Sequence, residues 1–375
     1  MSFFKKNIID GITPTPLINI PKINKLLGTN VIVKLEKTNP GGSIKDRAAI
    51  YIIEQAEKKG QLLPGGTIIE SSSGNFAISL AMIGAVKGYK VIALVDPKAT
   101  KTNTSLMKAF GAEVITVTEK DDTGSYHKTR IKLANDLARD IPNSYRPDQC
   151  FNVLSSVAHH QTTAREIHEQ CADNLAAVVC AVSTGGQIGG ISEYFSEHLP
   201  DVKVACVDAY GSTVFGGLSH TYKIPGVGLG WTPRNINDLN KIDCVYRVKD
   251  DAAYIAARLI CRHEGLLVGV SSGAVLLAAL KLSLQLGSDK PVLAVLGDSG
   301  ERYLDTLFND EWLTQNEIET SLDISELTEL ITSMEPPAVA DEIKGNYRDD
   351  LIYILEVPST TITHHHHLGS GINNA

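Results

Sequence analysis

Short runs of apolar, often β-branched residues alternate along the chain with longer segments whose apolar residues recur at helical spacing. Strands separated by helices of this length predict parallel sheets joined by right-handed crossovers. The predicted strands are 31–36, 67–71, 90–96, 113–118, 176–183, 203–209 and 291–298, and the predicted helices are one after residue 43 and those at 75–87, 102–110, from 186, 250–263 and 272–286. The alternation stops after 118 and resumes at 176, which predicts two open α/β sheets with ligands in the cleft at their carboxyl ends.

A glycine turn and a helix start meet in the segment NPGGSIKDR, residues 39–47. Ser43 is predicted to be the helix N-cap, and Asp46 follows in a capping-box position before an apolar-periodic run. Lys45 then lies in the first turn, where the positive end of the helix dipole disfavours its charge. One interpretation is a solvated surface lysine. The other is an amine with a depressed pKa, whose neutral form can attack a carbonyl.

Three further segments repeat one design, in which a strand ends in small polar residues and a helix follows. These segments are 71–75, 183–186 and 271–273. Unpaired N–H groups and the positive dipole end make each helix start a candidate anion site, although a plain N-cap explains each one taken alone. The GVGLG run at 226–230 has the spacing of a dinucleotide loop, but no clear strand precedes it and no helix follows it, which argues against that fold.

Composition narrows the class of protein. A chain of 375 residues, 43% of them hydrophobic, suffices for a sizeable core in two domains or lobes. The net charge of -8, without a Lys/Arg-rich block, argues against a nucleic-acid-binding protein. No apolar run reaches the length of a membrane span and no secretory signal is visible, so we expect a cytoplasmic location.

Neither the cysteines nor the histidine run of this chain is interpreted as a metal site. The six cysteines are dispersed and include no CxxC pair, which argues against a zinc site or a disulfide framework, so no metal is expected. The four-histidine run at 364–367, beside LGSGINNA, is typical of a purification tag. We therefore expect residues 364–375 to be a tag or a disordered tail.

Six motifs in collinear order carry a family resemblance. NPGGSIKDR, SSSGN, STGGQ, PGVGLG, EGLLVGVSSGA and GDSGERYL closely resemble the cysteine synthase and cystathionine β-synthase family of pyridoxal-phosphate enzymes, the fold type II group, over residues 8–313. The resemblance implies two open α/β domains with mostly parallel sheets and pyridoxal 5'-phosphate in the cleft between them. It implies a larger cofactor-binding domain (1–40 and 149–316), a smaller domain (41–148), a C-terminal appendage (317–363) and a homodimer.

The same resemblance assigns roles to individual residues. Lys45 matches the lysine that forms the Schiff base, Asn75 the partner of the pyridine hydroxyl oxygen, and Ser271 the partner of the pyridine nitrogen. The phosphate loop matches Ser183, Thr184, Gly185, Gly186 and Gln187, where many members carry Thr at the last position. The loop that holds the substrate carboxylate matches Ser72, Ser73 and Phe76, joined by Gln149. A neutral hydroxyl at the pyridine nitrogen favours expulsion of a β-substituent.

The family likeness implies β-replacement on an O-activated L-serine through an aminoacrylate intermediate, with Lys45 as the base for the Cα proton. The segments ALVDPKATKTN, DDTGSYHKTRI and VDAYGSTVFGG resemble the N-(2-amino-2-carboxyethyl)-L-glutamate synthase branch, which uses O-phospho-L-serine and L-glutamate in 2,3-diaminopropionate biosynthesis. The run NVLSSVAHHQTTAREI agrees, because it lacks both prolines of the NPANP run usual in cysteine synthases. A cysteine synthase using sulfide and a non-catalytic, cofactor-binding regulator are the alternatives.

Anionic substrates need cationic partners, best supplied by arginine. Arg130, in the run HKTRI, is the hypothesised partner of one of these anions, and a solvated helix arginine is the alternative interpretation. His159 and His160 are interpreted as loop or core histidines, which are more usual than catalytic ones.

Overall fold

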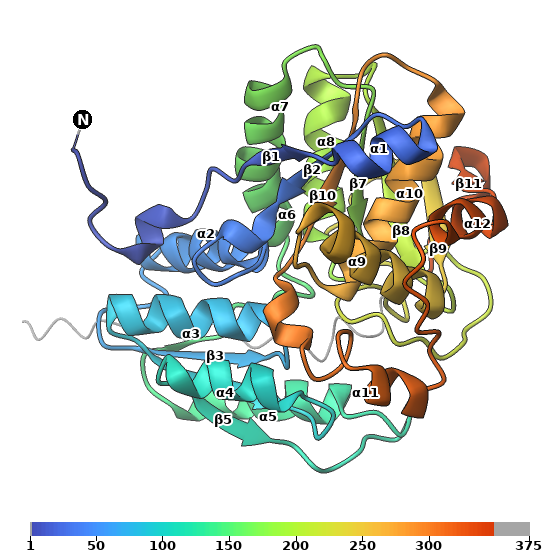
Figure 1. Cartoon of the computed structure of the whole chain (residues 1–375). Helices are drawn as coiled ribbons and strands as arrows, with labels where there is room; N and C mark the ends of the chain where they lie inside the picture. Colours follow the sequence, from blue (N-terminus) through green and yellow to red (C-terminus); the bar gives the residue numbers. More distant parts are fainter. Residues whose placement is uncertain (1, 349–375) are drawn as a thin grey trace, which may run out of the picture.

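A computed structural model of the chain describes residues 2–348, and its strands form two separate sheets (Figure 1). Among these residues, the larger sheet has seven strands in the order β1-β2-β10-β7-β8-β9-β11, and the smaller has four in the order β5-β4-β3-β6. The larger sheet contains β1 (Leu17–Asn19), β2 (Val31–Leu35), β7 (Ala177–Ala181), β8 (Lys203–Ala209), β9 (Cys244–Val248), β10 (Val292–Leu296) and β11 (Ala338–Val339). The smaller contains β3 (Thr67–Ser71), β4 (Lys90–Val95), β5 (Glu113–Thr116) and β6 (Ser144–Tyr145).

Parallel pairing dominates both sheets. All pairs in the smaller sheet are parallel, and in the larger sheet only the edge strands β1 and β11 pair antiparallel with their neighbours, within the described residues. The predicted α/β class with mostly parallel sheets is therefore confirmed. The predicted strand and helix positions agree with the structure to within about two residues wherever both ends were predicted.

The helices connect these strands and cover their faces (Figure 1). The α-helices are α1 (Pro21–Leu27), α2 (Lys45–Lys58), α3 (Asn75–Lys87), α4 (Lys101–Ala109), α5 (His127–Asp140), α6 (Leu154–His159), α7 (Arg165–Cys171), α8 (Gly186–His198), α9 (Asp250–Glu264), α10 (Val270–Leu286), α11 (Asp310–Gln315) and α12 (Glu326–Ser333). Shorter turns are η1 (Ile8–Gly11), η2 (Glu36–Thr38), η4 (Leu239–Lys241), η5 (Gly300–Tyr303), η6 (Ala340–Glu342) and the π-helical η3 (His160–Ala164), which joins α6 to α7.

Side chains alternate between two cores along the central strands. On β7, Val179 packs with residues of α9 and α10, whereas Val178 and Cys180 pack with residues of α8. A strand that is buried on both faces in this way has an uninterrupted apolar sequence, and the sequence of β7 is of this kind. In the smaller sheet, Ile68 faces the core that contains α2 and α3, and Ile69 faces the core that contains α5.

The start of α2 differs from the prediction. The N-cap of α2 is Ile44, so the predicted N-cap at Ser43 is wrong by one residue, although Ser43 Oγ accepts the N–H of Lys45 at 3.2 Å. Asp46 does not close a capping box with Ser43. The Asp46 carboxylate instead accepts the N–H of Gly41 at 2.7 Å and the hydroxyl of Ser79, and it is fully buried. The capping-box prediction is wrong because tight packing of the glycine turn against α2 and α3 offers this acid nearer donors.

Several elements were not predicted, including β1, β9, α1 and the segment from α6 to α7. The predicted appendage is described as far as residue 348 and contributes α12 and β11, which pairs with β9. The rest of it and the predicted tail at 364–375 lie outside the described residues. The domain boundaries stay a prediction. The strands within 17–35 and 177–296, together with β11 of the appendage, build the larger sheet, and the strands within 67–145 build the smaller one. No helix in residues 2–348 is both long and apolar enough to cross a bilayer.

Candidate active site

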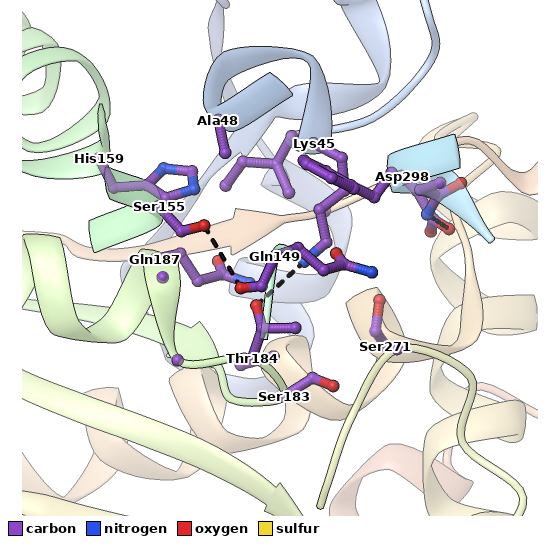
Figure 2. A pocket seen from close by; sticks show the side chains of 18 of the residues that line it. Lys45, Ala48, Gln149, Ser155, His159, Ser183, Thr184, Gln187, Ser271 and Asp298 are labelled. Carbon is purple, nitrogen blue, oxygen red and sulfur yellow. Dashed lines mark hydrogen bonds between the residues drawn. The ribbon is translucent and has the colours of Figure 1, made fainter. Parts of the chain in front are cut away.

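A cavity lies beyond the carboxyl ends of β7 and β10, where the strand order of the larger sheet reverses (Figure 2). From β7 the chain proceeds outward to β8 and β9, and it then returns to place β10 on the opposite side of β7. Open parallel sheets bind ligands at such a reversal. The predicted site residues that line the cavity are Lys45, Asn75, Phe76, Gln149, Ser183, Thr184, Gly185, Gly186, Gln187 and Ser271.

Backbone pairing places Lys45 at this reversal. Ile44 N donates to Gly297 O at 2.8 Å, and Ser299 N donates to Gly42 O at 3.0 Å, so the chain before α2 lies along the exit of β10. Lys45, the first residue of α2, consequently projects into the cavity (Figure 2).

The environment of Lys45 suits a neutral amine. Its Nζ lies 3.4 Å from Thr184 Oγ1, and no carboxylate of residues 2–348 forms an ion pair with it. Burial is the main cause that lowers the pKa of Lys45, a cause that its position at a helix start did not predict. The arrangement favours the nucleophilic interpretation of this lysine over the solvated one.

A buried network of charges anchors α2 beneath Lys45. Arg47 forms ion pairs with Glu36 at 2.8 Å and Glu166 at 3.0 Å, and Lys34 contacts Glu166 at 2.6 Å. The side chains of Lys34, Glu36 and Arg47 are fully buried, so each charge depends on its partners. Sequence reasoning missed this network, because its members come from β2, η2, α2 and α7.

The loop between β7 and α8 forms an anion cradle. The helix begins at Gly186, and its N-cap Gly185 adopts a left-handed φ of 81° and supplies no side-chain cap. A Cβ on Gly185 would lie 2.6 Å from Pro233, so only glycine fits there. The first-turn N–H groups of α8 therefore remain available to an anion beside the cavity. Gln187 lines the cavity, and its Oε1 is buried with no partner within residues 2–348.

Ile44, Ser271 and Gly297 line one part of the cavity. A Cβ built on Gly297 would meet nothing closer than Ser271 Oγ at 3.8 Å and Ile44 Cγ2 at 3.9 Å. Packing of the protein alone therefore does not demand glycine at position 297, whereas a planar ring in this space would. Ser271 lies in the first turn of α10 and directs its hydroxyl into the cavity (Figure 2).

Asn75 enters the cavity from the start of α3 and donates from Nδ2 to Asp298 Oδ2 at 2.8 Å. The same oxygen accepts the hydroxyl of Tyr303, whereas Asp298 Oδ1 is buried without a partner in the described chain. Burial raises the pKa of Asp298, and these two hydrogen bonds oppose that shift. Asp298 belongs to the GDSGERYL motif, but its contact with Asn75 has no local sequence signal.

Three predicted substrate residues lie outside the cavity lining. Ser72 Oγ accepts the N–H groups of Gly74 at 3.4 Å and Ala77 at 3.2 Å, which makes it a cap of α3. Arg130 donates from Nη1 to Ser73 Oγ at 3.0 Å and lies 3.6 Å from Asp96. The side chain of Arg130 is only 14% exposed, so the solvated-arginine interpretation is wrong, and the residue contacts the Ser73 loop instead.

His159 and Ser155 line the cavity although neither was predicted to be a site residue. His159 Nδ1 lies 2.7 Å from Thr163 Oγ1, in the π-helical turn that interrupts the helix. Burial, with the nearby charges of Arg47 and Lys45, moves the pKa of His159 well below its usual range, so its ring is neutral. Both residues belong to the NVLSSVAHH run of the sequence. Only the position of α6 beside α8 in the folded protein shows that they line the cavity.

Comparison with known proteins places the chain in a family. The sequence model described as "Pyridoxal-phosphate dependent enzyme" matches residues 8–298. A probable cysteine synthase of Bacillus subtilis is 41% identical over 305 residues, covering 80% of this chain and 96% of the relative. An N-(2-amino-2-carboxyethyl)-L-glutamate synthase of Ralstonia nicotianae is 37% identical over 310 residues, covering 83% of this chain and 91% of the relative. The crystal structure of an O-acetylserine dependent cystathionine beta-synthase from Helicobacter pylori matches with a TM-score of 0.73 and 31% identity, over 81% of this chain and 99% of that chain.

The donor set of the cavity fits pyridoxal 5'-phosphate. An amine with a lowered pKa suits its aldehyde, the uncapped start of α8 suits its phosphate, and the space beside Gly297 suits its ring. The chain therefore belongs to the pyridoxal-phosphate dependent enzymes of the cysteine synthase type, with pyridoxal 5'-phosphate as its cofactor and β-replacement as its class of reaction.

Proposed function

We propose that the protein joins O-phospho-L-serine and L-glutamate to form N-(2-amino-2-carboxyethyl)-L-glutamate and inorganic phosphate. The Cβ–O bond of the donor breaks, the glutamate nitrogen forms a bond to Cβ, and the displaced phosphate leaves. The observation that carries this choice is the sequence likeness to synthases of that name, together with three segments that resemble that branch. The bound cofactor supplies an electron sink for the negative charge that develops at Cα.

The protein's own groups bind, orient and transfer protons. We propose that Lys45 anchors the cofactor covalently and, once displaced by the amino acid, accepts and returns the Cα proton. Burial lowers the pKa of this amine, so a larger fraction is neutral near pH 7 and able to accept a proton. The neutral His159 and the neutral hydroxyl of Ser271 add no charge to the site.

We propose cofactor contacts for the residues that line the cavity. The N–H groups at the start of α8, with Ser183, Thr184 and Gln187, would hold the phosphate. Ser271 would face the pyridine nitrogen, and the amide of Asn75 would contact the ring hydroxyl.

Substrate contacts are proposed from the facing wall of the cavity. Gln149 and Phe76 line this wall, and Ser72 and Ser73 form the loop behind it. Arg130 contacts Ser73 and carries a positive charge, so we propose that it attracts the donor phosphate or the glutamate side-chain carboxylate.

The decisive experiment compares two nucleophiles. Purified holoenzyme is incubated with O-phospho-L-serine and either L-glutamate or sulfide, and phosphate release and product mass are measured. The proposal expects a product that retains the glutamate carbons, at a rate well above that with sulfide. Cysteine formation with sulfide alone would instead support the second candidate, a cysteine synthase, which the likeness to the Bacillus subtilis relative favours. Absence of turnover with either nucleophile and with O-acetyl-L-serine would leave a cofactor-binding regulator.

We also propose that the protein is a homodimer, as the family likeness implies, and that it is cytoplasmic. Sedimentation velocity of the holoenzyme would show one species of twice the mass of the 40.4 kDa chain if the first proposal holds.

A further inference from the structure

Glu70 is a buried carboxyl group that the proposed chemistry does not use. It lies near the end of β3 and is 1% exposed. Its Oε1 accepts the N–H of Ser71 at 2.8 Å, and its Oε2 accepts the N–H of Gln149 at 3.3 Å. One side chain at the end of β3 thereby reaches the loop of Gln149, 79 residues further along the sequence. The end of β3 leads to Asn75 at the cavity, and the loop contributes Gln149 itself.

The backbone of Gln149 is held by hydrogen bonds at both its N–H and its carbonyl group. Glu70 accepts its N–H, and Ser155, another residue of the cavity wall, donates its hydroxyl to the Gln149 carbonyl at 3.4 Å (Figure 2). The preceding residue, Asp148, has a left-handed φ of 55°, and its carbonyl accepts the N–H groups of Phe151 at 3.3 Å and Asn152 at 2.9 Å. The loop is thus a turn that the two contacts of Gln149 hold in place.

The groups that face Glu70 decide how its charge behaves. Arg146 attracts the carboxylate and Asp148 repels it, while Arg146 and Asp148 lie 3.4 Å apart as an ion pair. Burial raises the pKa of both Tyr145 and Cys150 to about 12, so these two neighbours stay neutral. Burial, the largest cause, also raises the pKa of Glu70 to about 7.

We infer that Glu70 is a positioning residue for the amino-acid substrate: its carboxyl group holds the Gln149 loop against the cavity, and loss of its acceptor oxygen releases the loop. A carboxylate can accept both N–H groups, whereas the amide of a glutamine presents a donor where one acceptor is needed. The substrate part of this inference rests on the proposed function. The loop part does not.

The loop is tested first, without any substrate. Hydrogen exchange of a peptide covering 146–152 is measured in the wild-type holoenzyme and in Glu70→Gln, at pH 6 and pH 8, with the intrinsic pH dependence of exchange removed. The wild type is expected to be about tenfold better protected than Glu70→Gln at pH 8, the effect of one buried hydrogen bond, and its protection is expected to change between pH 6 and pH 8 as Glu70 titrates. Glu70→Gln is expected to be poorly protected at both values.

A matched control uses an acid on the same side of the molecule but away from the cavity. Glu57 bonds to Lys87 and Tyr89, and Glu57→Gln is expected to exchange like the wild type in the 146–152 peptide. Should Glu70→Gln fail to fold, Ser155→Ala removes the other support of the Gln149 peptide. That variant is expected to loosen the loop while keeping its response to pH.

Substrate binding is then titrated through the absorbance of the cofactor. O-phospho-L-serine should bind Glu70→Gln about tenfold more weakly than wild type at pH 8, with its pH response reduced relative to Glu57→Gln. If wild type and Glu57→Gln show no response to O-phospho-L-serine, the proposed function fails, and the exchange experiment still decides the role of Glu70. Wild-type protection, affinity and pH response in Glu70→Gln would overturn the inference.

Discussion

The amide of Asn75 donates a 2.8 Å hydrogen bond to the carboxylate of Asp298, and this bond joins the start of α3 to the exit of β10. The two residues are 223 positions apart. Asp298 also accepts the hydroxyl of Tyr303, which fixes the position of its carboxylate. The orientation of the Asn75 amide toward the cavity is fixed as a result. One contact therefore links the two sheets and orients a proposed cofactor ligand.

Replacing Asn75 by Ala should destabilise the fold and weaken cofactor binding together. The buried Asp298 carboxylate would lose one of its donors, which costs about 1–3 kcal/mol of unfolding free energy. Urea unfolding and cofactor titration measure the two effects. Asn75→Asp keeps the shape but places two carboxyls together, so it should be less stable than Asn75→Ala at pH 8. Equal stability of both variants and wild type would show that the contact contributes nothing.

Lys45→Ala should remove the covalent attachment of the cofactor and lower turnover by at least about 10³-fold, because both the nucleophile and the proposed base are lost. Borohydride reduction followed by peptide mapping should find the pyridoxyl label on Lys45 in the wild type. Lys59→Ala, an exposed residue at the end of the same helix, is the control and should label normally. A label on any other lysine would contradict the assignment.

Arg130→Ala should weaken the apparent affinity for O-phospho-L-serine or for L-glutamate by about tenfold or more, because a charged hydrogen bond to an anion contributes roughly 1.5–3 kcal/mol. Arg130→Lys should recover part of the loss, since lysine keeps the charge but not the planar fork. Steady-state kinetics with each substrate varied in turn measures the effect. Arg139→Ala, exposed on the same helix, serves as the control. Unchanged affinities for both substrates would remove Arg130 from the anion site.

Arg47→Met should cost about 3–5 kcal/mol of unfolding free energy, because it leaves the buried carboxylates of Glu36 and Glu166 without their main cation. Arg139→Met breaks exposed ion pairs and should cost less than about 1 kcal/mol. Urea unfolding of the two variants under one condition gives the comparison. A cost for Arg47→Met no larger than for Arg139→Met would mean that the network is not a determinant of stability.

Asp208 should make stability fall as pH rises. Burial raises the pKa of this carboxyl to about 7, above its value in the unfolded chain, so between the two values the folded protein binds more protons. The stability that comes from the bound proton is complete below the unfolded pKa and is lost as pH rises through 7. Asp208→Asn has no such proton, so from pH 5 to pH 8 it should gain about 2–3 kcal/mol relative to wild type. If the difference in unfolding free energy between Asp208→Asn and the wild type is the same at pH 5 and at pH 8, the raised pKa is contradicted.

The sequence determined the elements that local physics controls. The apolar runs of β3, β4, β7 and β10 and the helical periodicity between them predicted parallel sheets, because strands buried on both faces must be apolar throughout. Small polar residues after these strands predicted where a ligand binds, since the carboxyl ends of parallel strands meet at one edge. The sequence also placed Lys45 at a helix start, although the burial that lowers its pKa comes from the tertiary structure.

Tertiary structure alone decided which side chains meet. Arg47 and Glu166 pair across 119 positions, and Glu70 reaches the peptide of Gln149 across 79, through burial that no local pattern encodes. For the same reason Ser72 Oγ accepts the N–H of Ala77 in the first turn of α3, and Asp46 turns to Gly41 and not to Ser43. Polar groups buried by packing bond to the nearest available partners, and only the folded arrangement of both sheets establishes which partners those are.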